Sequence, residues 1–71
     1  MNRYLIIIEE TPTGFSAYSP DLPGCVATGS TREEIEREMH GAIEFHIEGL
    51  QQAGEQIPKP RSLAAYCEVA A

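Results

Sequence analysis

The chain has 71 residues and a formal net charge of −6, from 11 acidic and 5 basic side chains. A chain of this length builds a core worth only about 3–5 kcal/mol, so association with other chains is the expected supplement. The acidic balance argues against direct binding to nucleic acid, because such binding depends on Lys and Arg side chains that meet phosphates. We therefore expect one small domain, residues 1–71, that binds other proteins.

The sequence shows no export or membrane signal. The first apolar run, Ile6–Ile8, is too short for a signal peptide and is followed at once by Glu9 and Glu10. No stretch approaches the roughly 20 apolar residues of a membrane span. Two cysteines, Cys25 and Cys67, are too few for a disulfide framework, and we expect buried thiols. These features indicate a cytoplasmic protein.

The first predicted element is a strand over residues 3–9 that is apolar on both faces. Alternation places Ile6 and Ile8 on one face and Leu5 and Ile7 on the other. A strand of this kind should be covered on both sides. A single helix covers only one face of a small sheet, so a second copy of the chain is expected on the other. Coverage by the chain's own tail is the alternative.

Turn residues separate this strand from two more. Residues 10–14 form a turn punctuated by Pro12 and Gly14, and residues 15–19 form the returning strand of a hairpin. Residues 20–24 follow as a second turn, in which two prolines fix φ and Gly24 supplies a positive φ. Residues 25–28 then read as a third strand, which Gly29 ends.

A long helix is predicted over residues 32–53. Thr31 and Glu34 make a capping-box pattern at its start, and Gly54 is placed to end it. Its apolar residues recur every three or four positions and form one stripe. Those positions are Ile35, Met39, Ala42, Ile43, Ile47, Leu50 and Ala53.

A proline-bearing connector over residues 55–62 leads to a last predicted strand over residues 63–69. Leu63, Ala65, Cys67 and Val69 share one face of this strand. The predicted order is β-β-β-α-β, with the last strand beside the first. The fold class is therefore α+β, an antiparallel sheet with one long helix packed on one face.

Catalytic and metal chemistry find little support in the residues. A cysteine with His40 or His46 as base lacks a third group to orient it. The two histidines are six residues apart on a helix and point about 120° away from each other, so they do not share a metal. Glu9 and Glu10 are neighbours on a strand and point to opposite faces. We expect no enzyme activity, no metal and no cofactor.

Three motifs resemble the HicB-like antitoxin family. They are the run from Tyr18 to Cys25 (YSPDLPGC), the run from Gly29 to Glu34 (GSTREE), and the pair of prolines in Ile57–Pro60. The resemblance implies a partial RNase H-like fold and a protein that neutralises a small basic HicA-type toxin, which cleaves RNA. Many family members add a DNA-binding domain, which this sequence lacks, so direct operator binding is not expected.

Two sets of residues are candidates for contact with such a partner. Asp21, Leu22 and Pro23 are expected to be exposed at the turn, and Glu44 and Glu48 lie on the acidic outer side of the helix. The helical region, residues 30–55, holds seven acidic and two basic residues, a net −5. Structural turn and cap roles are assigned to Gly24, Gly29, Thr31 and Glu34.

An alternative function fits the same fold. The chain could be a solitary HicB-like protein that forms a homo-oligomer, a dimer or tetramer, with a structural or small-ligand-binding role. A short basic partner gene beside this one would favour the antitoxin, and its absence would favour the solitary protein.

Overall fold

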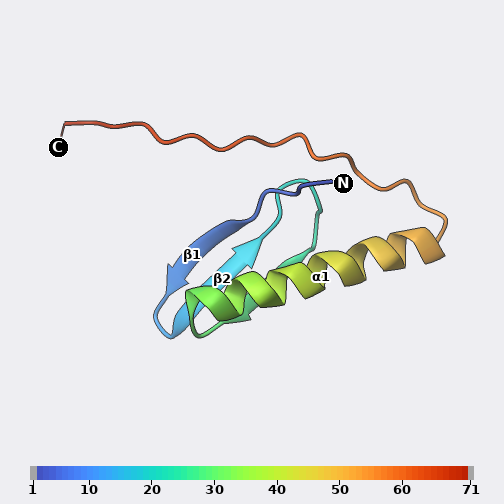
Figure 1. Ribbon diagram of the computed structural model, residues 1–71, viewed down its shortest axis with the longest axis horizontal. Coiled ribbons are helices and arrows are strands. Elements are labelled where there is room, and N and C mark those ends of the chain that lie inside the picture. Colours follow the sequence, from blue (N-terminus) through green and yellow to red (C-terminus); the bar gives the residue numbers. More distant parts are fainter. Residues whose placement is uncertain (1, 71) are drawn as a thin grey trace.

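The computed structural model describes residues 2–70 and contains three strands and one helix. The strands are β1 (Ile7–Thr11), β2 (Gly14–Tyr18) and β3 (Val26–Gly29), and the helix is α1 (Arg32–Gln52). The strands form an antiparallel sheet in the order β1-β2-β3, and α1 lies across one of its faces (Figure 1). The predicted α+β class, with one long helix on an antiparallel sheet, is confirmed.

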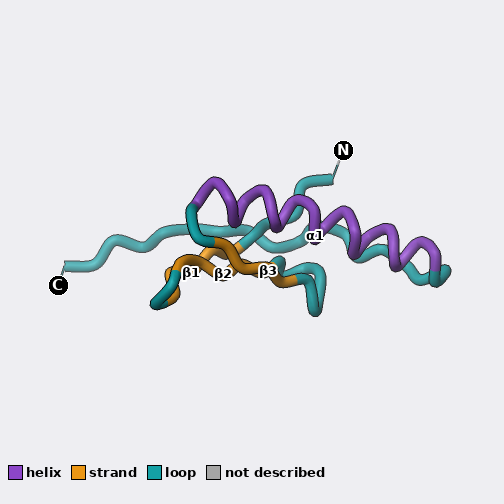
Figure 2. Tube along the Cα trace, turned by 90° about the horizontal axis from the view of Figure 1, so that it is seen from below, coloured by secondary structure: helices purple, strands orange, loops and turns teal. Residues whose placement is uncertain are grey.

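The register of the sheet sorts its residues onto two faces. Ala17 pairs with Ile8 on one side and Ala27 on the other, and these three residues pack toward the core. Tyr18 pairs with Ile7 and Val26, which therefore share the opposite face. Figure 2 shows the sheet nearly edge on, with α1 on one side only. The second face is thus left uncovered by the described chain.

The first strand begins later than predicted. Residues 3–9 were the expected strand, whereas β1 pairs with β2 only from Ile7 onward. The partner of Ile7 is Tyr18, and beyond it Pro20 turns the chain away, so residues 3–6 have no strand beside them. Tyr4 and Ile6 still pack against the core, as their place on the inner face requires.

The second turn sends a side chain into the core instead of exposing it. Leu22 was expected at the surface, but its side chain is 0% exposed and lies with Ala17, Cys25, Ile35 and Met39 in the buried cluster. The turn folds inward because the Leu22 N–H donates to Ser19 O (3.1 Å) and the Cys25 N–H donates to Leu22 O (3.0 Å). The neighbouring prolines and Asp21 suggested an exposed turn, but Leu22 is a core residue.

The predicted conformation of Gly24 is confirmed, with a φ of 83°. This region is costly for residues with a Cβ, and it lets the chain reverse directly after Pro23. Gly29 has a different reason to be glycine, because an added Cβ would lie 3.0 Å from the Ile35 nitrogen. The end of β3 and the first turn of α1 therefore approach each other closely there.

The helix start is capped as predicted. Thr31 Oγ1 accepts a hydrogen bond from the Glu34 N–H (3.1 Å). The Glu34 carboxylate reaches back to the Ser30 N–H (2.8 Å), one residue before the cap. Two donors at the helix start are thereby satisfied, which places the first turn of α1 firmly after β3.

The connector after α1 is tied to the start of the chain. The Tyr4 hydroxyl donates to Pro58 O at 2.6 Å, across 54 residues of sequence. This bond brings the connector back along the N-terminal segment, where residues 60–64 lie beside residues 3–6. The connector was predicted as an irregular proline-bearing segment, and the structure confirms that description.

The last predicted strand is not present as a strand. Residues 63–70, here called the C-terminal segment, run extended past the sheet without pairing to it (Figure 1). Leu63 and Tyr66 are 96% and 103% exposed. An alternating strand forms only where a sheet edge is in reach, and the connector, stiffened by Pro58 and Pro60, carries this segment clear of its own sheet. The Cα radius of gyration is accordingly 13.8 Å, against about 11 Å for a compact chain of this length.

Candidate partner-binding surface

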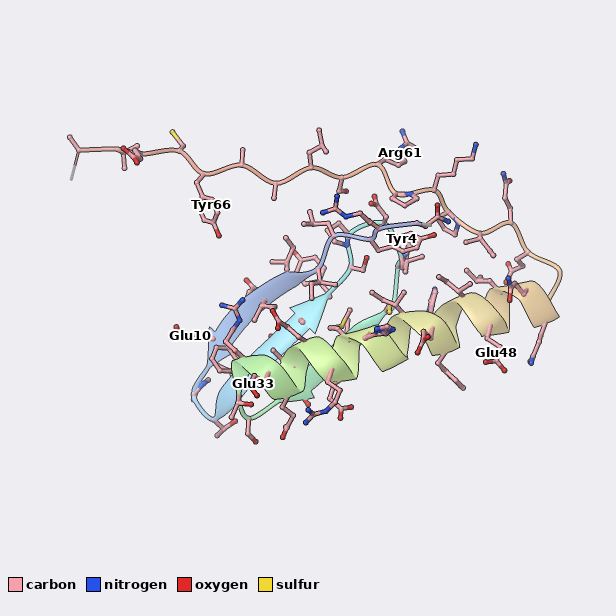
Figure 3. All side chains as sticks on the ribbon, viewed as in Figure 1. Tyr4, Glu10, Glu33, Glu48, Arg61 and Tyr66 are labelled. Carbon is pink, nitrogen blue, oxygen red and sulfur yellow. The ribbon has the colours of Figure 1, made fainter. Side chains whose placement is uncertain are left out.

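The outer side of α1 is strongly acidic. The helix contains six glutamates and two arginines, a net charge of 2 − 6 = −4. All but Glu34 among the glutamates are exposed. Figure 3 shows Glu33 near the start of the helix and Glu48 near its end, so the negative charge extends along most of its length. A surface of this kind attracts a basic partner over distances of several ångströms.

The two predicted acidic contacts, Glu44 and Glu48, are both exposed on this helix. Glu44 Oε2 lies 3.5 Å from His40 Nε2, and Glu48 Oε1 accepts from the Gln52 side-chain amide at 3.3 Å. Interactions between exposed side chains one helical turn apart contribute little to stability, so they are easily exchanged for contacts with a partner. Both carboxylates are therefore accessible to an incoming Lys or Arg.

Asp21, which was predicted as an exposed contact for a partner, uses its carboxylate for bonds within the chain. Its carboxylate accepts from the Arg61 N–H (3.0 Å), the Ser62 N–H (3.0 Å) and the Ser62 hydroxyl (2.8 Å). The hydrogen bond from the Arg61 N–H, followed by the two from Ser62, lowers the pKa of Asp21 below its ordinary value of 3.8. The sequence suggested bonds within the turn, whereas the partners lie about forty residues further on. Asp21 anchors the connector just before the C-terminal segment.

An apolar groove beside α1 was not foreseen. It has a volume of about 410 Å³ and is lined by Tyr4, Ile6, Ile43 and Ile47, with His40 and Glu44 among its polar residues. The groove arises because α1 packs mainly over β3 and β2, so the inner face at the start of β1 is only partly covered. We call it the β1–α1 groove. The apolar residues on both faces of the first predicted strand were the one signal in the sequence that could have revealed this groove.

Two further apolar surfaces are exposed. On the outer sheet face, Tyr18 and Val26 are side by side in the register and both exposed. On the helix, Phe45 is 79% exposed and lies outside the predicted apolar stripe. The outer face of the sheet was expected to need a cover, and none of the residues from 2 to 70 provides one.

The possible metal-ligating and nucleophilic side chains can now be placed in the fold. Among residues 2–70, no three His, Cys, Asp or Glu side chains lie close enough together to hold a metal ion. Burial raises the pKa of the Cys25 thiol, which makes the reactive thiolate scarcer at neutral pH. Cys67 was predicted to be buried and is exposed, because the segment that contains it is not part of the sheet.

Comparison with known families agrees with this arrangement. Residues 4–70 match the family model described as "HicB_like antitoxin of bacterial toxin-antitoxin system". The chain belongs to this family. The match covers the sheet, the helix and the C-terminal segment, so every surface described above lies within the HicB-like region. No helix in that part of the chain is long and apolar enough to span a membrane.

Two proteins of similar sequence show how far the similarity extends along the chain. An uncharacterized 14.9 kDa protein in the rep-hol intergenic region of Haemophilus phage HP1 is 38% identical over 63 residues, 89% of this chain. This chain spans only about half the length of that phage protein (47%). A UPF0150 protein of Helicobacter pylori is 36% identical over 66 residues, which are 90% of each chain.

A solved HicB-like structure has the same fold. The chain matches one from a "HicA3 and HicB3 toxin-antitoxin complex" with a TM-score of 0.74 and 37% identity. The match covers 83% of this chain and 70% of the other.

Proposed function

We propose that this HicB-like chain is an antitoxin module that binds and neutralises a small, basic HicA-type toxin, an RNA-cleaving protein. The observation that supports this most is the structural similarity to a protein solved in a toxin-antitoxin complex, combined with a net charge of −6. In this proposal the chain acts by binding and has no catalytic function. The complex is proposed to form in the cytoplasm and without direct contact between this chain and nucleic acid.

The proposed contact surface is the outer side of α1. Glu44 and Glu48 would meet basic side chains of the toxin, and Pro23, which is exposed, would lie at the edge of the contact. Opposite charges accelerate the encounter and fix the orientation of the two proteins. Leu22 would act indirectly, because it is buried and holds the turn in place.

A co-expression experiment tests the proposal. The short reading frame next to this gene is expressed alone and then together with this chain, and growth and co-purification are followed. Growth arrest alone, with rescue and a stable complex on co-expression, is the expected result. Arrest that this chain in excess does not relieve would contradict the proposal.

A matched pair of variants tests the surface. The double variant Glu44→Lys/Glu48→Lys should lose rescue and co-purification, because it replaces two attractive charges by repulsive ones. Glu9→Lys/Glu10→Lys changes the net charge equally on exposed residues of β1 and should keep both. Equal loss in both variants would show that the net charge matters and the helix surface does not.

A second function stays open for a specific reason. The uncovered sheet face and the β1–α1 groove would also suit a solitary homo-oligomeric protein with a structural or small-ligand role. A neighbouring gene product without toxicity and without binding to this chain would favour this alternative.

A further inference from the structure

The C-terminal segment has the residue pattern of a β-strand, but within residues 2–70 it pairs with no other strand. It is extended, and Leu63, Cys67 and Val69 alternate along one side of it. Leu63 and Val69 are 96% and 77% exposed, and Tyr66 on the other side is fully exposed. Figure 3 shows Tyr66 on a stretch that stands apart from the strands and the helix. Covering apolar residues in this pattern with a partner would remove their surface from water, which is favourable.

The sheet of the same molecule has a free edge at β1, with which an extended segment could pair. β1 is an edge of the sheet, so one row of its N–H and C=O groups has no strand beside it. The β1–α1 groove lies next to the start of this strand and is lined by Tyr4, Ile6, Ile43 and Ile47. The backbone of a fourth strand beside β1 would form hydrogen bonds with the free N–H and C=O groups of this edge. Every second side chain of that strand would fill the groove.

We propose that two copies of the chain exchange their C-terminal segments, so that residues 63–70 of each copy pair with the β1 edge of the other. In this arrangement Leu63, Cys67 and Val69 enter the partner's groove. Tyr66 then lies on the outer sheet face, beside Ile7. The strand predicted from the sequence thus forms, but on a second molecule. This inference does not depend on the proposed toxin.

The connector favours exchange over closure onto the same sheet. The Tyr4–Pro58 and Asp21–Ser62 hydrogen bonds hold the chain up to Ser62, and Pro58 and Pro60 stiffen it. The segment therefore leaves the body in a fixed direction instead of folding back. The C-terminal segment leaves the body of the protein beside residues 3–6. A two-fold axis near that point would bring the β1 edges of two copies together, so each segment would have only a short distance to span to the other copy. β3, the other edge, lies on the opposite side of the sheet.

Charge is compatible with this interface. The C-terminal segment contains a single charged residue, Glu68, which alternation places on the side away from the groove and its Glu36 and Glu44. Closing the segment onto its own sheet would also pair β1, but the connector, which is held by Tyr4 and Asp21, would then have to turn back on itself. Exchange joins two copies of the chain, and association is the usual supplement for a core of this size.

The first test measures mass in solution with adjacent proline variants. In a paired strand, alternate N–H groups point toward the neighbour, so one of Ala64→Pro and Ala65→Pro must remove a ladder donor. The unchanged chain should be a dimer by light scattering. At least one of the two variants should dissociate about tenfold more readily, with an unchanged helical circular dichroism signal. A monomeric native chain, or a dimer indifferent to both prolines, would overturn the proposal.

The second test separates exchange from closure. A 1:1 mixture of ¹³C-labelled and unlabelled chain, refolded together, is studied by isotope-filtered nuclear Overhauser spectroscopy. Contacts between Ile6 or Ile8 methyl groups and Leu63 or Val69 should appear between labelled and unlabelled molecules. Contacts found only within one molecule would show closure onto the same sheet and would overturn exchange even if the protein were a dimer.

A thiol measurement supplies an independent readout. Cys67 is exposed in the single chain, and the exchanged dimer would cover it. Its alkylation should therefore be slow at high protein concentration and accelerate on dilution and in the disrupting proline variant. Alkylation that is equally fast at all concentrations would contradict burial of this side of the segment.

Discussion

Asp21 and Ser62 are joined by two hydrogen bonds across 41 residues of sequence. One Asp21 oxygen accepts from the Ser62 N–H at 3.0 Å, and the other accepts from its hydroxyl at 2.8 Å. This link fastens the connector to the second turn of the sheet. It determines where the chain leaves the body of the protein, and so where the C-terminal segment can find a partner.

Removing the charge of Asp21 should loosen the connector. In Asp21→Asn the acceptor is a neutral amide oxygen, so the bonds from the Arg61 and Ser62 N–H groups, which share one Asp21 oxygen, become weaker than those to the carboxylate. The amide protons of both residues should exchange faster with solvent, as measured by hydrogen exchange in NMR. Ser62→Ala removes only the hydroxyl bond and should leave the Arg61 amide protected. Unchanged exchange in Asp21→Asn would contradict the link.

The same link should depend on pH in the acid range. The pKa of Asp21 is lowered in the folded protein relative to its ordinary value of 3.8, chiefly by the Arg61 N–H and then by Ser62. A lowered pKa means that the stabilisation is fully present above pH 3.8 and is lost as the pH falls through the folded-state value. The amide shifts of Arg61 and Ser62 should therefore be constant from neutral pH down to about 4 and change below it. This change should be absent in Asp21→Asn.

Leu22 should be essential for stability although it lies in a turn. Leu22→Ala removes a fully buried side chain and should cost about 2–5 kcal/mol of unfolding free energy, enough to unfold much of a small protein. Urea titration followed by circular dichroism measures the loss. Phe45→Ala truncates a larger but mostly exposed side chain and should cost clearly less. Equal losses would contradict the burial described here.

The capping threonine should contribute a smaller, local amount. Thr31→Ala removes the acceptor of the Glu34 N–H and should lower the unfolding free energy by about 1 kcal/mol. The matched control is Ser30→Ala, which leaves the Ser30 N–H bond to Glu34 intact because only the backbone makes it. Denaturant midpoints of the two variants should therefore differ, and a Ser30→Ala loss as large as that of Thr31→Ala would contradict the assigned cap.

Local chemistry made much of the fold predictable. The helix, its cap at Thr31 and the positive φ of Gly24 follow from neighbouring residues and the periodicity of apolar side chains. The acidic helix surface with Glu44 and Glu48 follows from the same periodicity. The three motifs also identified the family. They consist of proline, glycine and capping residues at short spacings, which can be recognised in the sequence alone.

Long-range packing decided the remaining features. Leu22 and Asp21 are adjacent in a polar-looking turn, yet one side chain fills the core and the other binds the connector. Neither role is visible locally, because each depends on residues that only folding brings near. The alternation of residues 63–69 predicted a strand, and this prediction is wrong for the described chain, because a strand needs an edge to pair with. The sequence by itself determined which segments can form strands and helix. The tertiary structure decided which of them find partners within one molecule, because the connector's direction and the free edges of the sheet exist only in the folded chain.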